Sequence, residues 1–145
     1  MVEIVRFGFQ DQKFFDICSS IRTRVFVEEQ KVDRELEYDH EEESHFYLLY
    51  FGGNPVATAR WRETEKGIKL ERFAMLKQYR NKGLGTELLK AVLEDVSKLG
   101  KRVYLHSQLK AVSYYERAGF KKVGERFTEA GIEHYQMELK LHQGF

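Results

Sequence analysis

The sequence has little of several things that would point to a particular class of protein: it contains one cysteine, one proline and almost no net charge. The single cysteine, Cys18, excludes an intramolecular disulfide and a metal site built from clustered cysteines. The 24 basic and 23 acidic residues nearly cancel, so no overall field favours nucleic acid or a membrane surface. No apolar run approaches the roughly 20 residues that span a bilayer, and no signal peptide is visible. We therefore expect a cytoplasmic protein without nucleic-acid or membrane partners.

What the chain does contain is enough apolar and aromatic material for one folded core. Its 145 residues are 42% hydrophobic and 14% aromatic, which is typical of a single globular domain, here residues 1–145. No internal repeat, low-complexity tract or linker divides it. Cys18 lies among Phe14, Ile17 and Ile21 at helical spacing, so we expect a buried structural thiol rather than a nucleophile.

Hydrophobic periodicity and turn signals divide the chain into short strands and three helices. Residues 11–27 carry apolar side chains close to a 3.6-residue period, with Asp11 as a candidate N-cap. The strongest turn, residues 52–55, reads Gly-Gly-Asn-Pro and joins two strands. The predicted strands are 2–7, 45–51, 56–63, 68–76, 102–107, 120–123 and 134–139, and the predicted helices are 11–27, 86–99 and 110–118. The fold class is therefore mixed α/β (α+β), with an antiparallel N-terminal meander followed by a strand–helix–strand–helix–strand half.

A glycine-containing loop between an apolar strand and a helix is the most informative local pattern. Residues 80–85 read Arg-Asn-Lys-Gly-Leu-Gly and lead into the predicted helix. Glycines let backbone amides approach an anion closely, and a helix N-terminus adds unpaired N–H groups and a positive dipole end. The loop lacks the Gly-Lys-Ser/Thr ending of an ATP-binding P-loop, and it lacks the third glycine of a dinucleotide-binding turn. It is either a plain turn or a binder of a different phosphorylated ligand.

Two blocks of the chain, in this order, resemble the GCN5-related N-acetyltransferase (GNAT) superfamily. Residues 78–85 read Gln-Tyr-Arg-Asn-Lys-Gly-Leu-Gly and are similar to its acyl-CoA-binding motif, Arg/Gln-x-x-Gly-x-Gly/Ala after a strand. Residues 108–120 read Gln-x-x-Ala-x-x-Tyr-Tyr-Glu-x-x-Gly-Phe and are similar to its second block. Residues 22–30, 57–60 and 69–72 further resemble the small bacterial ElaA-like branch. The resemblance covers nearly the whole chain and implies a single-domain GNAT fold, whose mixed, mostly antiparallel sheet is splayed at the acyl-CoA site and flanked by helices.

The resemblance implies acetyl-CoA as cosubstrate, and no spacing of histidines or cysteines supports a metal site. The pyrophosphate would lie on the backbone amides of the loop, with two cations adding charge. The residues assigned to this contact are Arg80, Asn81, Lys82, Gly83, Leu84, Gly85 and Thr86. The thioester arm would run along the backbone of Phe73, Ala74 and Met75, where one N–H group polarises the thioester carbonyl. Gln108, where the family has asparagine, is assigned to the pantetheine arm, and Asn81, where it commonly has glycine, is a residue type that tolerates positive φ.

Within the second block, Tyr115 is the candidate general acid. A departing CoA thiolate is basic, with a thiol pKa of about 8.5, and a tyrosine with a pKa of about 10 can protonate it without a large shift. The alternative role for Tyr115 is aromatic packing of the short helix. We assign that packing role to its neighbour, Tyr114.

The general base has several candidates, because a substrate ammonium must lose a proton before it attacks. Glu71, on the strand before the glycine loop, is the leading one. Its alternative role is an ion pair with Arg60 or Arg72. His106, His134 and a water chain are the other candidates, although a histidine on a strand is often only a hydrogen-bonded structural residue.

An acidic run follows the first predicted helix. Its members are Asp33, Glu35, Glu37, Asp39, Glu41, Glu42 and Glu43. The run is either a solvated surface or an attractor for a cationic substrate such as a polyamine, an aminoacyl amine or a lysine side chain.

We expect an acyl-CoA-dependent N-acetyltransferase that moves an acetyl group from acetyl-CoA to a primary amine of a small molecule or peptide, by direct attack in a ternary complex. Cys18 is not placed to form a covalent acyl-enzyme. One alternative is a non-catalytic acyl-CoA-binding sensor or interaction module. Another is an acyl-homoserine-lactone synthase, which shares the Arg-x-x-Val-Phe element of residues 22–26 but has a tryptophan pattern that this chain, with Trp61 alone, lacks. The identity of the amine and the oligomeric state, a homodimer included, stay open.

Overall fold

A seven-stranded sheet runs through residues 1–31 and 39–140, the part of the chain that the computed structural model describes. The strand order is β1-β2-β3-β4-β5-β7-β6, and every neighbouring pair is antiparallel except β4 and β5. The elements are β1 (Val2–Gly8), α1 (Gln12–Arg22), the π-helix η1 (Thr23–Glu29), β2 (His45–Phe51), β3 (Asn54–Thr64), β4 (Gly67–Met75), the 3-10 turn η2 (Lys77–Tyr79), α3 (Leu84–Ser97), β5 (Val103–Gln108), the 3-10 turn η3 (Leu109–Ala111), α4 (Val112–Arg117), β6 (Phe120–Glu129) and β7 (Ile132–Leu139). The predicted mixed, mostly antiparallel sheet flanked by helices is confirmed.

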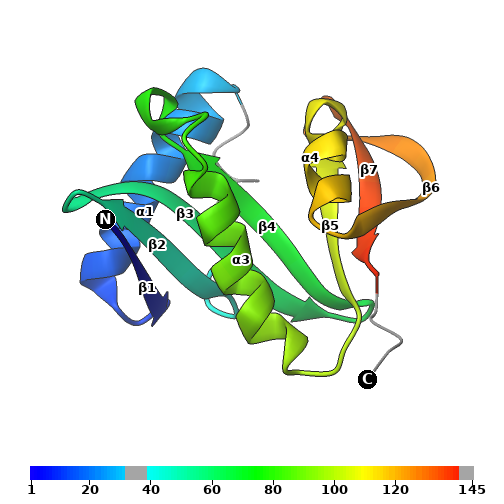
Figure 1. The fold of residues 1–145 in the computed structure, drawn as a ribbon, viewed down its shortest axis with the longest axis horizontal. Coiled ribbons are helices and arrows are strands. Elements are labelled where there is room, and N and C mark those ends of the chain that lie inside the picture. The colour runs from blue at the N-terminus through cyan, green and yellow to red at the C-terminus, as the bar shows by residue number, and fades with distance from the viewer. Residues whose placement is uncertain (32–38, 141–145) are drawn as a thin grey trace.

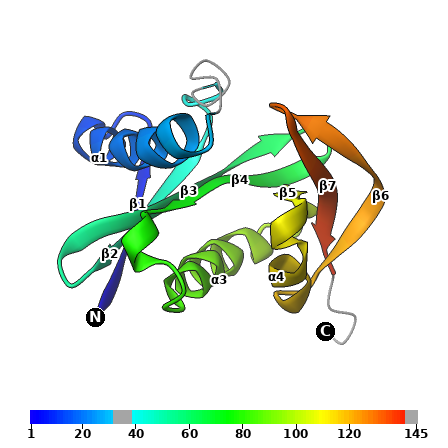
Figure 2. The same cartoon turned by 90° about the horizontal axis from the view of Figure 1, so that it is seen from above.

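Helices cover both faces of the sheet (Figures 1 and 2). Figure 2 shows α1 on one face and α3 and α4 on the other. The alternation of β2 explains this arrangement, because Phe46 and Leu48 pack into the cluster around α1, whereas Tyr47 and Leu49 pack into the main cluster with α3. Both faces of the strand are therefore buried. Of the helices in the described ranges, none is long and apolar enough to cross a membrane.

The sheet opens between its two parallel strands. β4 and β5 pair only over Ile68–Leu70 and Val103–Leu105, and no pairing between them continues beyond these residues, all of which the structure describes. On the other side of β4 the register with β3 shifts, so that Arg72 and Phe73 together face Ala59. Arg72 has φ of 58°, the left-handed conformation that β-bulges often use. The bulge bends β4, and the sheet is splayed here as the resemblance implied.

Two elements differ from the prediction. The first predicted helix, residues 11–27, is an α-helix that continues as the π-helix η1 to Glu29. The predicted strand 120–123 extends to Glu129, because Gly124, with φ of 77°, accommodates a bulge in its register with β7. Ala130 and Gly131, with φ of 52° and 77°, then form the tight turn to β7.

Cys18 is buried as predicted, with no exposed surface. Its Sγ lies 3.0 Å from Thr58 Oγ1. Burial raises the pKa of the thiol, so it is unreactive at neutral pH.

Candidate active site

Two cavities lie at the splay of β4 and β5. The larger has a volume of about 490 Å³ and is lined by β4, β5, the β6–β7 turn and the end of η1. The smaller, of about 150 Å³, is lined by β4 and by residues of α3 and α4. Phe73 and Tyr115 line both cavities. These two residues therefore lie at the boundary where a ligand in the larger cavity would contact a ligand in the smaller one.

The glycine loop leads directly into α3 beside the smaller cavity. Gly83 is the N-cap of α3, with φ of 80° and no side-chain cap hydrogen bond. Asn81 has φ of 65°, as its residue type allows. Because no side chain caps the first turn, the backbone N–H groups there are open to an anion. This geometry fits a coenzyme A pyrophosphate.

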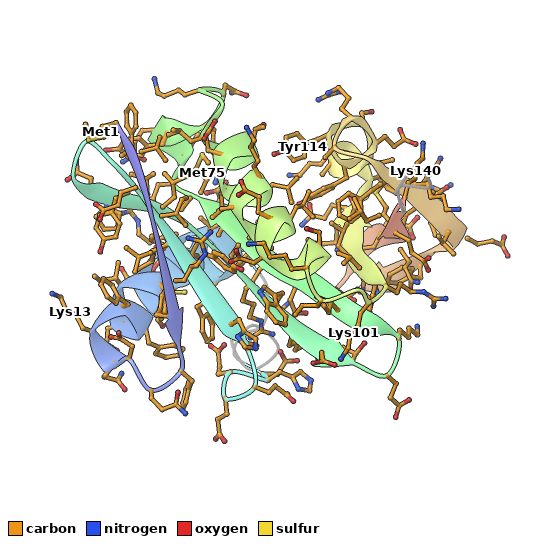
Figure 3. The ribbon with its side chains drawn as sticks, turned by 60° about the horizontal axis from the view of Figure 1, so that its bottom comes forward. Met1, Lys13, Met75, Lys101, Tyr114 and Lys140 are labelled. Carbon is orange, nitrogen blue, oxygen red and sulfur yellow. The ribbon has the colours of Figure 1, made fainter. Side chains whose placement is uncertain are left out.

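Gly85 keeps the first turn of α3 close to the walls of the smaller cavity. A Cβ at Gly85 would lie 3.7 Å from both Met75 Cε and the Tyr114 hydroxyl. Figure 3 shows Met75 and Tyr114 on either side of this turn. The Tyr114 hydroxyl also lies 3.4 Å from Thr86 Oγ1. Any larger side chain at Gly85 would extend into the space that the predicted acyl-CoA site occupies.

Arg80 does not point toward the first turn of α3. Its Nε donates to the Met75 carbonyl oxygen at 3.0 Å, and its two terminal nitrogens donate to the Glu29 carboxylate at 2.7 and 3.0 Å. The hydrogen bond from Arg80 lowers the pKa of Glu29. The bidentate contact predicted for Arg80 is thus made with a carboxylate of η1 rather than with a phosphate. Lys82, the other predicted cation, is exposed.

The predicted path for the thioester arm lies on the open edge of β4. Ala74 and Met75 pair with β3 on one side, and their other edge faces the splay, where β5 no longer pairs. Ala74 is buried, whereas Phe73 and Met75 are half-buried. Their side chains pack in or against the core clusters, and all three residues line the smaller cavity. The contact of their backbone with the thioester arm stays a prediction.

Tyr115 is half-buried and held by three aromatic rings. The centroid of the Tyr115 ring lies 6.4 Å from that of Phe73, 5.2 Å from that of Tyr114 and 5.8 Å from that of Phe120. Within residues 1–31 and 39–140 its hydroxyl makes no hydrogen bond. Burial and the neighbouring Tyr114 raise the pKa of Tyr115 above its ordinary value. The hydroxyl is therefore protonated at neutral pH and has a proton to donate.

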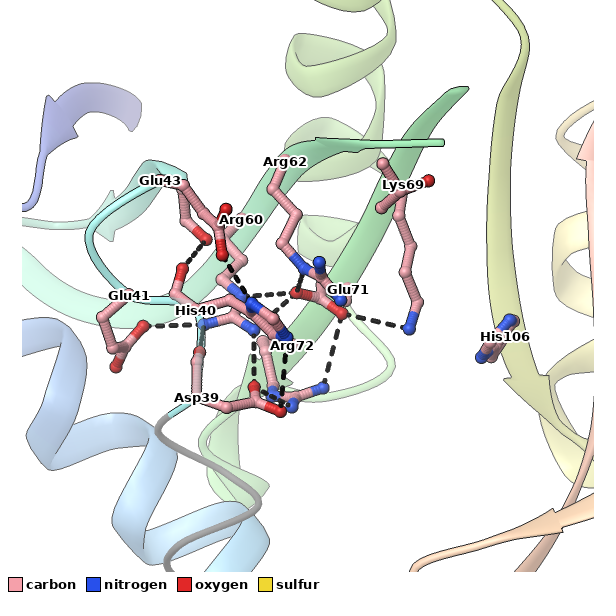
Figure 4. A network of polar contacts seen from close by, with 12 residues as sticks. Asp39, His40, Glu41, Glu43, Arg60, Arg62, Lys69, Glu71, Arg72 and His106 are labelled. Carbon is pink, nitrogen blue, oxygen red and sulfur yellow. Dashed lines mark hydrogen bonds and ion pairs between the residues drawn. The ribbon is translucent and has the colours of Figure 1, made fainter. Parts of the chain in front are cut away.

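Glu71 lies in the wall of the larger cavity, and four cationic side chains surround its carboxylate (Figure 4). The Nε atoms of Arg60 and Arg62 each donate to Oε2 at 2.8 Å. Lys69 Nζ lies 3.3 Å and the Arg72 guanidinium 3.7 Å from Oε1. Burial alone would raise the pKa of Glu71, but the four charges hold it well below its usual range. A carboxylate of low pKa is a weak base, so these contacts oppose the leading role predicted for Glu71 and match its ion-pair alternative.

Both histidines predicted as alternative bases line the same cavity. His106 Nδ1 lies 2.9 Å from Glu129 Oε1, and this hydrogen bond lowers the pKa of Glu129. His134 Nδ1 lies 2.7 Å from the Ile132 carbonyl oxygen, which can only accept. In a neutral ring that donates from Nδ1, the lone pair is on Nε2. Either histidine can therefore accept a proton at Nε2.

Gln108 ends β5 beside the same cavity. Its Nε2 donates to Gln30 Oε1, at the end of η1, at 3.2 Å. This contact links the two sides of the opening. The contact with a pantetheine arm stays a prediction.

Two members of the acidic run are paired with buried arginines. Asp39 Oδ1 lies 3.2 and 3.1 Å from nitrogens of Arg60 and Arg72. The Glu41 carboxylate accepts from Arg22 at 2.9 Å and from Arg60 at 2.7 Å. Arg22 and Arg60 are 1% and 0% exposed, so the buried Glu41 neutralises interior charge. Asp39 pairs with Arg60 as well but also lines the larger cavity. Of the rest, Glu42 and Glu43 are exposed, and Asp33, Glu35 and Glu37 lie outside the described residues.

Four charged side chains of the larger cavity have no part in the predicted site: Arg62, Lys69, Lys110 and Glu129. Arg62 and Lys69 are cross-strand partners of β3 and β4, so their proximity depends on a register that the sequence does not state. Glu129 lies on the part of β6 that was not predicted as strand. The sequence feature that could have placed Glu129 at a strand end is the turn-forming Ala130-Gly131 pair that follows it.

Comparison with known proteins agrees with this geometry. The family model described as an acetyltransferase (GNAT) domain matches residues 9–141. An uncharacterised N-acetyltransferase of Bacillus subtilis, YjcF, is 38% identical over 120 residues, which cover 81% of this chain and 86% of that protein. An acyl-CoA N-acyltransferase from Pseudomonas aeruginosa has a similar structure, with a TM-score of 0.86 and 27% identity over 97% of this chain and all of that one. Escherichia coli ElaA shares the fold, with a TM-score of 0.86 and 23% identity over the same shares of the two chains.

Proposed function

Because the chain belongs to the GNAT acetyltransferase family, we propose that it transfers an acetyl group from acetyl-CoA to a primary amine by direct attack in a ternary complex. Membership confirms the resemblance carried by residues 78–85 and 108–120. The observation that supports the proposed reaction is the position of Tyr115, which lines both cavities at the splay. In this proposal the smaller cavity belongs to the donor and the larger one to the acceptor.

Acetyl-CoA, when bound, supplies an acetyl group activated as a thioester. The first-turn amides of α3 and residues Asn81 to Thr86 would hold its pyrophosphate. The open edge of β4 at residues 73–75 would hold the arm, and one N–H group there would stabilise the charge that develops on the carbonyl oxygen. Lys82 is exposed and adds positive charge. Arg80 would have to leave Glu29 to reach a phosphate.

Proton transfer is assigned to one group on each side of the reacting bond. Tyr115 donates its hydroxyl proton to the departing thiolate. On the acceptor side we assign the base to His106, whose Nδ1 contact with Glu129 orients the ring and leaves Nε2 to accept the proton. Glu71, tied to four cations, fixes the cavity wall instead. His134 and a water chain are the alternatives that mutagenesis must exclude.

An amine screen tests this function. Purified protein is incubated with acetyl-CoA and a library of primary amines, and free CoA thiol is measured together with the mass of the acetylated product. The proposal requires amine-dependent CoA release. Binding of acetyl-CoA without release for any amine would instead identify a non-catalytic acyl-CoA sensor.

A further inference from the structure

Two cations stand directly opposite each other in the wall of the larger cavity. Arg62 of β3 and Lys69 of β4 are cross-strand partners, and their side chains are only 14% and 12% exposed. Like charges in this arrangement destabilise a sheet. A pair of largely buried cations at a cavity is therefore unexpected unless something anionic compensates them.

Within the described residues both side chains form ion pairs with one carboxylate, that of Glu71, which also contacts two other cations. Arg62 Nε donates a hydrogen bond to it at 2.8 Å, and Lys69 Nζ forms an ion pair with it at 3.3 Å. Arg60 and Arg72 are the other two cations. Arg62 uses only Nε in this contact. Over residues 1–31 and 39–140, its two terminal nitrogens have no hydrogen-bond partner, and Lys69 forms no ion pair except with Glu71.

The other two carboxylates of the cavity form their ion pairs with other side chains. Asp39 pairs with Arg60 and Arg72, and Glu129 pairs with His106. The charge of Lys69 contributes to the lowered pKa of Glu129 but forms no ion pair with it among the described residues. In the described lining the cations are Arg62, Lys69, Arg72 and Lys110, and the carboxylates are Asp39, Glu71 and Glu129. Arg60, fully buried behind this wall, also pairs with Glu41. Figure 4 shows Lys69 extending from β4 beside Glu71.

We propose that Arg62 and Lys69 bind an anionic group of the acceptor, so that the substrate is a primary amine that also carries a carboxylate or a phosphate. This inference rests on the acetyltransferase function proposed above. The spare donors of Arg62 form a planar fork that suits either oxyanion, and the Lys69 ammonium adds a second charge. A polyamine, by contrast, would bring further positive charge to a wall that already has more cations than carboxylates.

Matched amines test the substrate class. Each pair differs only in the anionic group: amino acids and their amides, β-alanine and β-alaninamide, and 2-aminoethyl phosphate and ethanolamine, with spermidine as the cationic member. We expect kcat/KM to be at least tenfold higher for the anionic member of a productive pair. Whether the carboxylate pairs or the phosphate pair show this preference identifies which anionic group the site binds. Equal or faster acetylation of amides or spermidine would overturn the inference while leaving the acetyltransferase function intact.

Variants then test the residues. Arg62→Gln and Lys69→Met should each raise KM for the anionic amine about tenfold, which corresponds to one charge-assisted hydrogen bond. KM for the matching amide and for acetyl-CoA should not change, and Arg62→Lys should recover part of the loss. Lys66→Met, an exposed cation in the turn between the same strands, is the control. An equal rise for acid and amide would show a structural role and contradict the proposal.

A binding measurement separates the two proposals if no amine releases CoA. Inorganic phosphate and acetate are titrated into ¹⁵N-labelled protein, and shifts of the backbone amide signals of β3 and β4 around positions 62 and 69 are followed in the wild type and in the Arg62→Gln/Lys69→Met double variant. Saturable shifts that the double variant abolishes would support an anion site even where the acetyltransferase proposal fails. Absence of saturable shifts, or identical shifts in the double variant, would overturn the anion site.

Discussion

The rings of Phe73 and Tyr115 meet at 66°, with centroids 6.4 Å apart, in the wall shared by the two cavities of the splayed sheet. Phe73 belongs to the bulge of β4, and Tyr115 belongs to α4 of the second half of the chain. Their contact therefore connects β4 with α4, beside the opening where β4 and β5 no longer pair. Tyr115 lines both cavities there, which is the position that a general acid between donor and acceptor requires.

Replacing Tyr115 with phenylalanine should lower kcat at least 100-fold, the usual contribution of a positioned acid. The ring contacts survive this change, so the dissociation constant of acetyl-CoA should stay within about twofold in calorimetric titration. Because the pKa of Tyr115 is raised, kcat of the wild type should show no loss up to about pH 9 from this group. Tyr50→Phe on β2 is the control and should leave kcat unchanged. An unchanged kcat for Tyr115→Phe would show that Tyr115 only packs against its neighbours.

Replacing His106 with glutamine should lower kcat/KM for the amine about 100-fold at neutral pH. The measurement is kcat/KM for the amine in both proteins. His45→Gln on β2, whose ring stacks on Trp61 away from the cavities, should leave kcat/KM unchanged. A loss of about 100-fold in His134→Gln, with little change in His106→Gln, would instead assign the base to His134.

The fold was predictable where its signals are local. Apolar periodicity located every strand except the second part of β6, as well as the first and second long helices, to within a few residues, and the glycine loop identified the start of α3. The bulge at Arg72 was not predictable, because it depends on the register between β3 and β4. The β6–β7 hairpin was underestimated, since the bulge near Gly124 interrupts the alternation that marks a strand.

In the candidate site, too, the contacts within a contiguous motif were predictable and those between distant segments were not. Tyr115 and the glycine loop belong to contiguous motifs, so their neighbourhood followed from sequence order. The partners of Arg80 and His106 did not: Glu29 and Glu129 are 51 and 23 residues away, and no spacing rule connects them. The ion pair that Glu71 forms with Arg62 was likewise not predictable, because it depends on the register between β3 and β4.

Replacing Gly83 with valine should weaken acetyl-CoA binding about tenfold or more in calorimetric titration. Gly83 has φ of 80°, which a β-branched residue adopts only with strain, and the loop would shift its amides away from the anion. Gly100, beyond the other end of α3, is the matched control, since it has φ of 66° and open space around its missing Cβ. Gly100→Val should lower stability comparably but leave acetyl-CoA affinity unchanged. Equal affinity in both variants would remove the loop from the pyrophosphate site.

Replacing Glu71 with glutamine should destabilise the protein by about 3 kcal/mol at pH 7, because it leaves buried Arg60 with one partner fewer. Although burial opposes it, the surrounding cations keep the pKa of Glu71 below its ordinary 4.5 in the folded state. The contribution of this carboxylate is therefore present in full above about pH 5, and it is lost as the pH falls through 4.5 and below.

Urea unfolding of both proteins from pH 8 to pH 3 measures this dependence on pH. The gap between the two proteins should be constant above pH 5 and should shrink in the acid range. Glu63→Gln, an exposed glutamate paired with Lys101, should cost less than about 1 kcal/mol at every pH. A Glu71→Gln gap that is the same at pH 3 and pH 7 would mean that the ionised carboxylate is not what stabilises the cluster. If Glu71→Gln instead stays stable and lowers kcat/KM for the amine about 100-fold, Glu71 is the base after all.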